Sequence, residues 1–218
     1  MNLDQIGLKY NSDKSSEFHN YLGFYEKSLE HTRYNNNNVM EIGILNGDSL
    51  KILSEYFENS TIYAFDIHDK SHLDANNIKI FIGDQSDRGF LEKTFEDEYF
   101  DLILDDGSHV MEHQQISIGC LFKKLKPGGI YIIEDLHTSL PDYIETQNYG
   151  KGMFGLNEDN TNSTIEFLNG VKLRDKNNFY LSDTEYSYLK NNIESIEIKE
   201  TARRDYNNVS ITSIIKKI

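Results

Sequence analysis

Residues 100–138 of the chain read FDLILDDGSHVMEHQQISIGCLFKKLKPGGIYIIEDLHT and hold its clearest structural pattern. Two apolar runs, Leu102–Leu104 and Ile130–Ile133, lack polar alternation, which is typical of strands buried on both faces. Between them an apolar side chain recurs at helical spacing, at Ile118, Leu121, Phe122 and Leu125. We expect Pro127-Gly128-Gly129 to stop this helix and to turn the chain into the second strand. The pattern predicts a β-α-β unit with two parallel strands.

Each of these two strands ends in a pair of acids, Asp105-Asp106 and Glu134-Asp135. A right-handed crossover places both carboxyl ends on one edge of the sheet, and open α/β sheets bind ligands at that edge. Four carboxylates gathered there repel one another unless a cation or a ligand lies between them. The pairs therefore indicate a metal or cofactor site, with solvated loop acids as the alternative in an acidic protein.

The composition limits the classes of protein to which the chain can belong. Its 218 residues suffice for one domain with a full core, with or without an appended segment. The 36 acidic and 22 basic residues give a net charge of −14, which argues against a nucleic-acid partner. A single cysteine, Cys120, cannot form an internal disulfide, and no apolar run reaches the length of a membrane span. We therefore expect a soluble cytoplasmic protein.

A run of four asparagines, Asn35–Asn38, separates a leading segment, residues 1–34, from a main domain, residues 35–218. Beside the two strands above, the main domain is expected to contain strands at Val39–Ile44, Thr61–Phe65, Ile78–Ile82, Ile193–Ile198 and Val209–Ile215. The last two runs are spaced as an antiparallel pair. The sequence therefore predicts an α/β fold with a seven-stranded, mostly parallel sheet to which the C-terminal hairpin adds an antiparallel strand.

The turns after these strands carry residues that suit a nucleoside site. Glu41, Gly43 and Gly47 form the pattern Glu-x-Gly-x-x-x-Gly, which lacks the third glycine of pyrophosphate-binding loops. Asp66 lies 23 residues after Gly43, near the offset at which an acid binds the ribose hydroxyls in dinucleotide folds. Asp84-Gln85 is placed to contact an adenine ring, with a bare turn as the alternative. The favoured ligand is a nucleoside without phosphates.

A set of motifs in fixed order extends this interpretation. They are Tyr10-Asn11-Ser12-Asp13-Lys14 with His19, Glu41-x-Gly43-x-x-x-Gly47, Asp66, Gly83-Asp84-Gln85, Asp105-Asp106-Gly107-Ser108-His109, Leu125-Lys126-Pro127-Gly128-Gly129 and Glu134-Asp135-Leu136-His137-Thr138. Their order resembles class I S-adenosylmethionine-dependent methyltransferases. More narrowly, it resembles the metal-dependent sugar O-methyltransferases of macrolide and surface-polysaccharide pathways, which are related to cephalosporin hydroxylase-like proteins. The resemblance covers about residues 7–175 and is weakest after Pro141, where the sequence predicts a substrate loop.

The resemblance implies a Rossmann-like sheet and S-adenosylmethionine as cofactor. The residues implied to bind the cofactor are Ser12, Lys14, Glu41, Gly43, Gly47, Ser49, Asp66, Asp84, Gln85 and Asp105. Residues 1–34 are implied to cover it, with Lys14 anchoring an acidic group such as Asp105 or the carboxylate of the cofactor. Because adjacent residues of a strand point to opposite faces, Asp105 is expected to face the methionine end and Asp106 the metal.

The resemblance also implies a divalent metal and a general base. The implied metal ligands are Asp106, Glu134 and Asp135, whose oxygen atoms suit Mg²⁺ or another hard divalent cation. His109 is implied to remove the proton of the acceptor hydroxyl. His113 and His137 are weaker candidates for contacts with the substrate.

The implied activity is the transfer of a methyl group to a hydroxyl of a sugar, with a nucleotide-linked sugar as the favoured acceptor. The expected setting is the biosynthesis of a capsule, a lipopolysaccharide or a natural product. Within enzymes, the alternative is an O-methyltransferase acting on another small molecule, a phenol or a phosphoramidate. Outside enzymes, it is a non-catalytic module that binds S-adenosylmethionine. The sequence does not determine which metal binds. It also leaves a homo-oligomer open, because relatives often carry an added oligomerisation domain.

Overall fold

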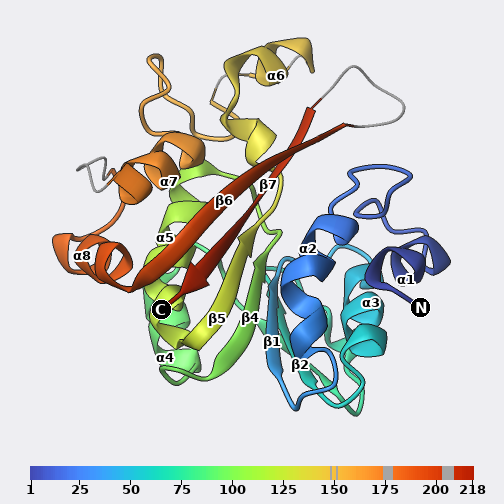
Figure 1. Ribbon diagram of the computed structural model, residues 1–218. Coiled ribbons are helices and arrows are strands. Elements are labelled where there is room, and N and C mark those ends of the chain that lie inside the picture. Colours follow the sequence, from blue (N-terminus) through green and yellow to red (C-terminus); the bar gives the residue numbers. More distant parts are fainter. Residues whose placement is uncertain (148, 151, 174–178, 203–208) are drawn as a thin grey trace.

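The computed structural model describes residues 1–147, 149–150, 152–173, 179–202 and 209–218 (Figure 1). In these ranges the strands are β1 (Asn38–Ile42), β2 (Thr61–Asp66), β3 (Ile78–Ile82), β4 (Phe100–Asp105), β5 (Leu125–Ile133), β6 (Ile193–Ala202) and β7 (Val209–Lys217). The α-helices are α1 (Leu3–Lys9), α2 (Leu22–Leu29), α3 (Asp48–Tyr56), α4 (Arg88–Thr94), α5 (Met111–Leu121), α6 (Pro141–Thr146), α7 (Thr164–Leu173) and α8 (Asp183–Asn192). Short 3-10 turns are η1 (Glu30–Thr32), η2 (Ser71–Leu73), η3 (Phe122–Lys124) and η4 (Leu136–Ser139).

The strands pair into one sheet in the order β3-β2-β1-β4-β5-β7-β6. Strands β1 to β5 are parallel to one another, whereas β7 runs antiparallel to both β5 and β6. This topology confirms the predicted Rossmann-like α/β fold. Ile42 of β1 pairs with Asp105 of β4, and Asp105 pairs with Ile133 of β5. The carboxyl ends of the central strands therefore lie side by side, which brings both acidic pairs to one edge.

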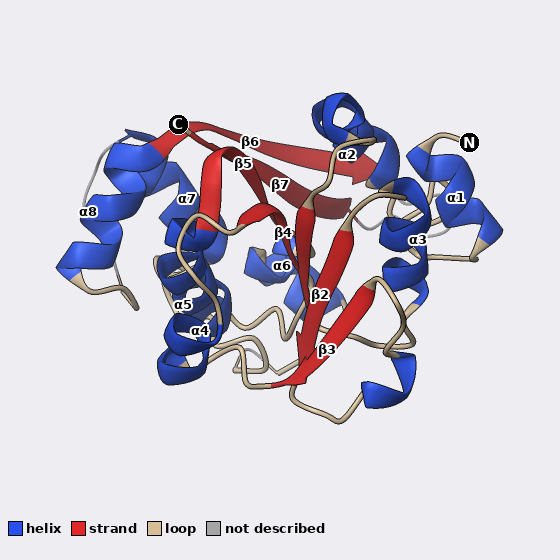
Figure 2. Cartoon of the chain, turned by 90° about the horizontal axis from the view of Figure 1, so that it is seen from below, coloured by secondary structure: helices blue, strands red, loops and turns tan. Residues whose placement is uncertain are grey.

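Helices cover both faces of the sheet (Figure 2). One side carries α1, α2 and α3, and the other carries α4, α5, α7 and α8. Successive strand residues divide between the two faces, since Val39 packs in the cluster beside α3 and Met40 in the cluster beside α5. Both residues are fully buried. The apolar runs are therefore buried on both faces, as their pattern predicts.

The connection into β5 differs from the prediction. α5 ends at Leu121, η3 follows, and β5 begins at Leu125. Pro127-Gly128-Gly129 therefore does not stop the helix but lies inside the bounds of β5. Gly128 has φ +77° there, and the pairing of β4 with β5 shifts register next to it. A bulge at this point accommodates the proline, which has no N–H to donate to a neighbouring strand.

The leading segment contributes to the core, so it is more than a cover. Leu3 and Ile6 of α1 are each 1% exposed, and Leu22 of α2 is 3% exposed; all three pack in the cluster that contains α3. The sequence analysis does not predict α1. A capping box starts this helix, in which the backbone N–H of Gln5 donates to Asn2 Oδ1 at 2.8 Å.

The stretch after Thr138 is more ordered than the predicted substrate loop. η4 ends at Ser139 and α6 begins at Pro141, and Ile144 of α6 packs with Met111 and Phe154 in a small apolar cluster. In the described part of the chain, every helix is too short or too polar to cross a lipid bilayer.

Candidate active site

Two adjoining cavities lie where β1, β2, β4 and β5 end. The Asp66 cavity has a volume of about 450 Å³, and the Glu41 cavity a volume of about 260 Å³. Residues that line the Asp66 cavity include Gly43, Asp66, Asp84, Gln85, Asp106 and His109. Residues that line the Glu41 cavity include Ser12, Lys14, Glu41, Gly47, Ser49 and Asp106. Because Asp106 and Gly43 line both, the two cavities share a wall.

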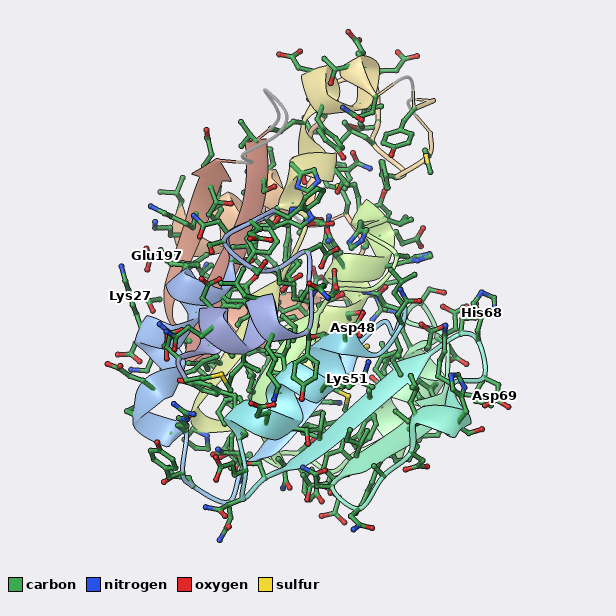
Figure 3. All side chains as sticks on the ribbon, turned by 90° about the vertical axis from the view of Figure 1, so that its right-hand side faces the viewer. Lys27, Asp48, Lys51, His68, Asp69 and Glu197 are labelled. Atoms are coloured by element: carbon green, nitrogen blue, oxygen red, sulfur yellow. The ribbon has the colours of Figure 1, made fainter. Side chains whose placement is uncertain are left out.

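Figure 3 labels four residues at or next to the borders of the cavities. His68 and Asp69 lie in the turn after β2, and His68 lines the Asp66 cavity. Asp48 and Lys51 lie together near the start of α3, where their side chains form an ion pair of 2.8 Å, and Asp48 lines the Glu41 cavity. The turn after β2 and the start of α3 therefore border the site.

The turn after β1 is shaped by Gly43 and Asp66. Gly43 has φ +89°, and a Cβ atom there would lie 2.3 Å from the backbone oxygen of Asp106, so no larger residue fits. Asp66 Oδ2 accepts the backbone N–H of Ile44 at 2.7 Å, and Oδ1 accepts that of His68 at 2.8 Å. A carboxylate has further lone pairs, so Asp66 can hold the turn and still accept hydrogen bonds from a ligand.

Gln85 and Asp105 brace the loop that carries the acidic and histidine side chains. Gln85 donates from Nε2 to Asp105 Oδ1 at 2.6 Å and accepts the backbone N–H of Ser108 at 2.9 Å. The Tyr131 hydroxyl donates to Asp105 Oδ2 at 3.3 Å. Asp105 is 0% exposed, and its burial raises its pKa to about 8. Asp105 lies outside the residues that line the two cavities. A direct contact between Asp105 and the cofactor stays a prediction, and the position of Asp105 outside both cavity walls does not favour it.

A buried lysine neutralises part of the acidic edge. Lys14 Nζ forms ion pairs with Asp106 Oδ2 and with Glu134 Oε2, the second at 2.5 Å. The other oxygen of Glu134 accepts the Tyr25 hydroxyl at 3.0 Å. Burial opposes the charge of Lys14, but the two carboxylates raise the pKa of its ammonium well above the ordinary value. Lys14 therefore stays charged between Asp106 and Glu134.

Asp135 is surrounded by three histidines. Its Oδ2 lies 3.7 Å from His109 Nε2, and its Oδ1 lies 4.0 Å from His19 Nδ1 and 3.9 Å from His137 Nδ1. Oδ1 also accepts the Tyr21 hydroxyl at 2.9 Å. Burial opposes ionisation, but the histidines lower the pKa of Asp135 below its ordinary value. Asp135 is therefore an ionised carboxylate at neutral pH.

Two hydroxyl side chains of strand β7 contact residues of the leading segment at the acidic edge. Ser210 Oγ lies 2.8 Å from His19 Nδ1, and Thr212 Oγ1 lies 2.6 Å from the Tyr25 hydroxyl. The leading segment therefore contacts β7 through these side chains, next to the two acidic pairs.

Glu41 is a further buried acid in the site. It is 2% exposed, and its Oε2 atom has no hydrogen-bond partner among the described residues. Burial raises the pKa of Glu41 to about 7, against the opposing effects of Lys14 and Ser49. The atom is available to a cationic group in the Glu41 cavity.

The structure gathers most of the sequence-predicted site residues around these two cavities. His113 lines the Asp66 cavity, where its Nδ1 lies 2.8 Å from Ser108 Oγ. His137 is 2% exposed, stacks edge-on against Tyr143 and lies outside the cavity walls. Among the described residues, a metal-type cluster within 4.8 Å is formed by Asp106, His109 and Asp135. Glu134, a predicted ligand, is instead held by Lys14 and Tyr25.

No motif in the sequence marks Tyr21 and Tyr25 as site residues, yet their hydroxyls donate to Asp135 and Glu134. Their partners lie more than 100 residues away along the chain, and no local pattern marks a tyrosine for such a contact. The only signal was the tyrosine content of the segment before β1.

The chain is similar to known methyltransferases, although no family model matches it. Demethylmacrocin O-methyltransferase of Streptomyces fradiae is 36% identical over 145 residues, which are 63% of this chain and 37% of that protein. The 8-demethyl-8-(2-methoxy-alpha-L-rhamnosyl)-tetracenomycin-C 3'-O-methyltransferase of Streptomyces olivaceus is also 36% identical over 145 residues, again 63% of this chain and 37% of that protein.

A solved structure is similar over the whole chain. It is the MycE methyltransferase from the mycinamycin biosynthetic pathway in complex with Mg and SAH, with a TM-score of 0.75 and 27% identity. The match covers 100% of this chain and 55% of that one, so the chain spans about half the length of this relative. In sequence and in fold, the chain is a homologue of the S-adenosylmethionine-dependent sugar O-methyltransferases of macrolide and tetracenomycin pathways.

Proposed function

We propose that the protein transfers the methyl group of S-adenosylmethionine to a hydroxyl of a sugar, with Mg²⁺ at the acidic edge. The observation that carries this proposal is the meeting of Asp106, His109 and Asp135 at the wall of a cavity of nucleoside size. Acids, a base and a nucleoside site then lie together, which is what metal-assisted methyl transfer to a hydroxyl requires.

The two cavities suit the two halves of the cofactor. At about 450 Å³, the Asp66 cavity falls within the size range of small-molecule sites, and Asp66 offers lone pairs to the ribose hydroxyls. The methionine part would enter the Glu41 cavity, which Ser12 and Ser49 line together with Glu41. The SAH held by the solved relative supports this cofactor.

The donor atoms at the acidic edge fit a hard divalent cation. Asp106, Glu134 and Asp135 are proposed to hold it, since carboxylate oxygens are the ligands that Mg²⁺ prefers. The ammonium of Lys14 contacts both Asp106 and Glu134, so these carboxylates already stabilise one positive charge at this edge. His109 lies beside Asp106 and Asp135, where it is proposed to act on the acceptor proton and not on the metal. The Mg in the solved relative supports the choice of metal.

His109 is proposed as the general base. When bound, Mg²⁺ supplies Lewis acidity that favours the alkoxide form of the acceptor hydroxyl. His109 Nε2 takes the hydroxyl proton, and the ionised Asp135 at 3.7 Å stabilises the resulting imidazolium. The acceptor oxygen forms its new bond to the methyl carbon as the bond from that carbon to the cofactor's sulfur breaks. The braced loop keeps His109 in place, since Gln85 fixes the backbone one residue before it.

The acceptor is proposed to be a sugar hydroxyl of a small glycosylated molecule, because the names of the curated relatives describe such substrates. More specifically, we propose a nucleotide-linked sugar as the acceptor. We also propose that the protein acts in natural-product assembly rather than in a polysaccharide pathway. Since the chain matches only part of each relative, its own acceptor must be identified directly.

The test is the release of S-adenosylhomocysteine from S-adenosylmethionine, measured against a panel of glycosylated macrolides and nucleotide sugars with and without a chelator. We expect turnover with at least one glycoside, lost on chelation and restored by Mg²⁺. Full activity after exhaustive chelation would exclude the metal role. Tighter binding of NAD than of S-adenosylmethionine, measured by calorimetry, would exclude the cofactor.

A further inference from the structure

Lys14 lies where the proposed metal has to bind. Its ammonium contacts one oxygen each of Asp106 and Glu134, and the residue is 5% exposed. Both carboxylates are proposed metal ligands, so that the ammonium and a divalent cation compete for the same oxygen atoms. Two cations cannot share these oxygens without strong repulsion, because the surroundings are largely screened from water.

A third acidic side chain, Glu41, lies near Lys14. Glu41 lines the same cavity as Lys14 and Asp106. The carboxylate of Glu41 and the ammonium of Lys14 attract each other electrostatically. Glu41 is 2% exposed, and its Oε2 has no hydrogen-bond partner among the described residues. The Glu41 cavity, of about 260 Å³, leaves room for a flexible lysine side chain to turn toward that atom.

The backbone of Lys14 need not move for this change. Its carbonyl accepts the backbone N–H of Tyr21 at 2.9 Å, and Tyr21 is itself fully buried and bonded to Asp135. The movement is thus confined to four methylene groups and an ammonium. The leading segment keeps its place over the acidic edge.

We propose that Lys14 is an internal counterion, which neutralises Asp106 and Glu134 in the metal-free protein and moves to Glu41 when a divalent cation binds. The inference rests on the proposed metal site and adds a second state of the same site. Lys14 lowers the affinity for the metal, and Glu41 reduces this effect by accepting the displaced ammonium.

The test is a double-mutant cycle with Mg²⁺ as the probe, measured by calorimetry on wild type, Lys14→Met, Glu41→Gln and the double variant. Lys14→Met should bind Mg²⁺ more tightly, by a factor in the usual range of coupling between two ligands, about 5–150-fold. Glu41→Gln should weaken Mg²⁺ binding when Lys14 is present and have no effect in the Lys14→Met background. Lys9→Met is the matched control, because Lys9 forms an exposed ion pair with Glu55 in the same segment.

The outcomes separate the inference from the proposed function. If wild type binds Mg²⁺ and folded Lys14→Met binds it equally or more weakly, the counterion role is wrong and the metal site stands. If wild type does not bind Mg²⁺ at all, the metal site and the inference fail together. Should Lys14→Met not fold, the ¹⁵N signal of the Lys14 ammonium in wild type decides the question. It must shift when Mg²⁺ is added, and an unchanged signal overturns the exchange.

Discussion

Asp105 illustrates, at the scale of a single residue, how a buried carboxyl makes stability depend on pH. Burial raises its pKa from an ordinary 3.8 to about 8, so the folded protein keeps a proton that the unfolded chain releases. Between these two values the folded state binds more protons, and stability therefore falls as pH rises. Each unit of pKa difference corresponds to about 1.4 kcal/mol.

Replacing this carboxyl with an amide should remove its part of the pH dependence. Asp105→Asn keeps the shape and can still accept from Gln85 at its amide oxygen, while its NH₂ group donates to the Tyr131 hydroxyl oxygen, but it cannot ionise. We expect the variant to gain stability relative to wild type as pH rises from about 4 to 8. Urea denaturation at pH 5 and at pH 8 measures the difference. An equal decline in both proteins would show that Asp105 does not titrate in this range.

His109 should affect the chemical step and not the binding steps. His109→Ala is expected to slow methyl transfer by about 10²–10⁴-fold, the usual contribution of a positioned base. Mg²⁺ and S-adenosylmethionine affinities should change little, since Asp106 and Asp66 remain. His113→Ala is the control, because His113 lines the same cavity but lies outside the metal-type cluster. Rapid-quench single-turnover rates and calorimetry separate the two effects, and an unchanged rate in His109→Ala would remove the base.

Asp66 should matter for the cofactor. Asp66→Asn is expected to weaken S-adenosylmethionine binding by about 1.5–3 kcal/mol, the range for hydrogen bonds to a charged group. Asp69→Asn is the matched control, since Asp69 lies in the same turn and accepts the backbone N–H of Ser71 outside the cavity wall. Calorimetry that finds equal affinities for both variants would contradict the nucleoside assignment.

At the scale of elements, the leading segment is the part whose role the structure changes most. Ile6 of α1 is 1% exposed and packs with residues near α3. Ile6→Ala should therefore cost about 2–5 kcal/mol of unfolding free energy, as large-to-small core changes do. Leu173→Ala, at a leucine that is 70% exposed, should change it by less than about 0.5 kcal/mol. Denaturation curves that coincide for Ile6→Ala and wild type would show that residues 1–34 are only a cover.

The sequence predicted the strands well and the leading segment poorly, for physical reasons. An apolar run such as Ile130–Ile133 is informative by itself, because a strand buried on both faces has few polar positions. The short helices α1 and α8 form chiefly through tertiary packing, although the capping box of Ser182 and Glu185 marks the start of α8. A capping box is a local signal, which the sequence carries here as Ser182 followed three residues later by Glu185.

The candidate site likewise has features that the sequence predicts and contacts that it does not predict. Topology alone brings Asp106 and Asp135 to one edge, because parallel strands that follow one another in a β-α-β unit end together. The contacts of Lys14 with Asp106 and of Tyr25 with Glu134 join segments 92 and 109 residues apart, which spacing cannot reveal. The prediction therefore named the acids and an anchoring role for Lys14, but the acids that Lys14 contacts are Asp106 and Glu134 and not Asp105, and the contact of Tyr25 was not predicted.

At the scale of the whole molecule, metal binding should stabilise the fold. A ligand that binds only the folded state adds about 2.7 kcal/mol at a concentration of 100 times its Kd. We expect Mg²⁺ to raise the melting temperature of wild type and to leave that of Asp106→Asn unchanged, because this variant loses a proposed ligand. Differential scanning calorimetry with and without Mg²⁺ measures both. Equal shifts in the two proteins would place the metal elsewhere on this acidic molecule.

The pairing of the leading segment with β7 bears on how the protein is made. His19 and Ser210, whose side chains meet at 2.8 Å, are 191 residues apart, so the ribosome completes one long after the other. Until β7 has emerged, one edge of β5 has no partner, because β7 lies between β5 and β6. An unpaired strand edge in a nascent chain invites pairing with other chains. We therefore expect the nascent chain to be prone to such pairing until β7 has been synthesised, and the contacts of the leading segment with β7 at the acidic edge can form only then.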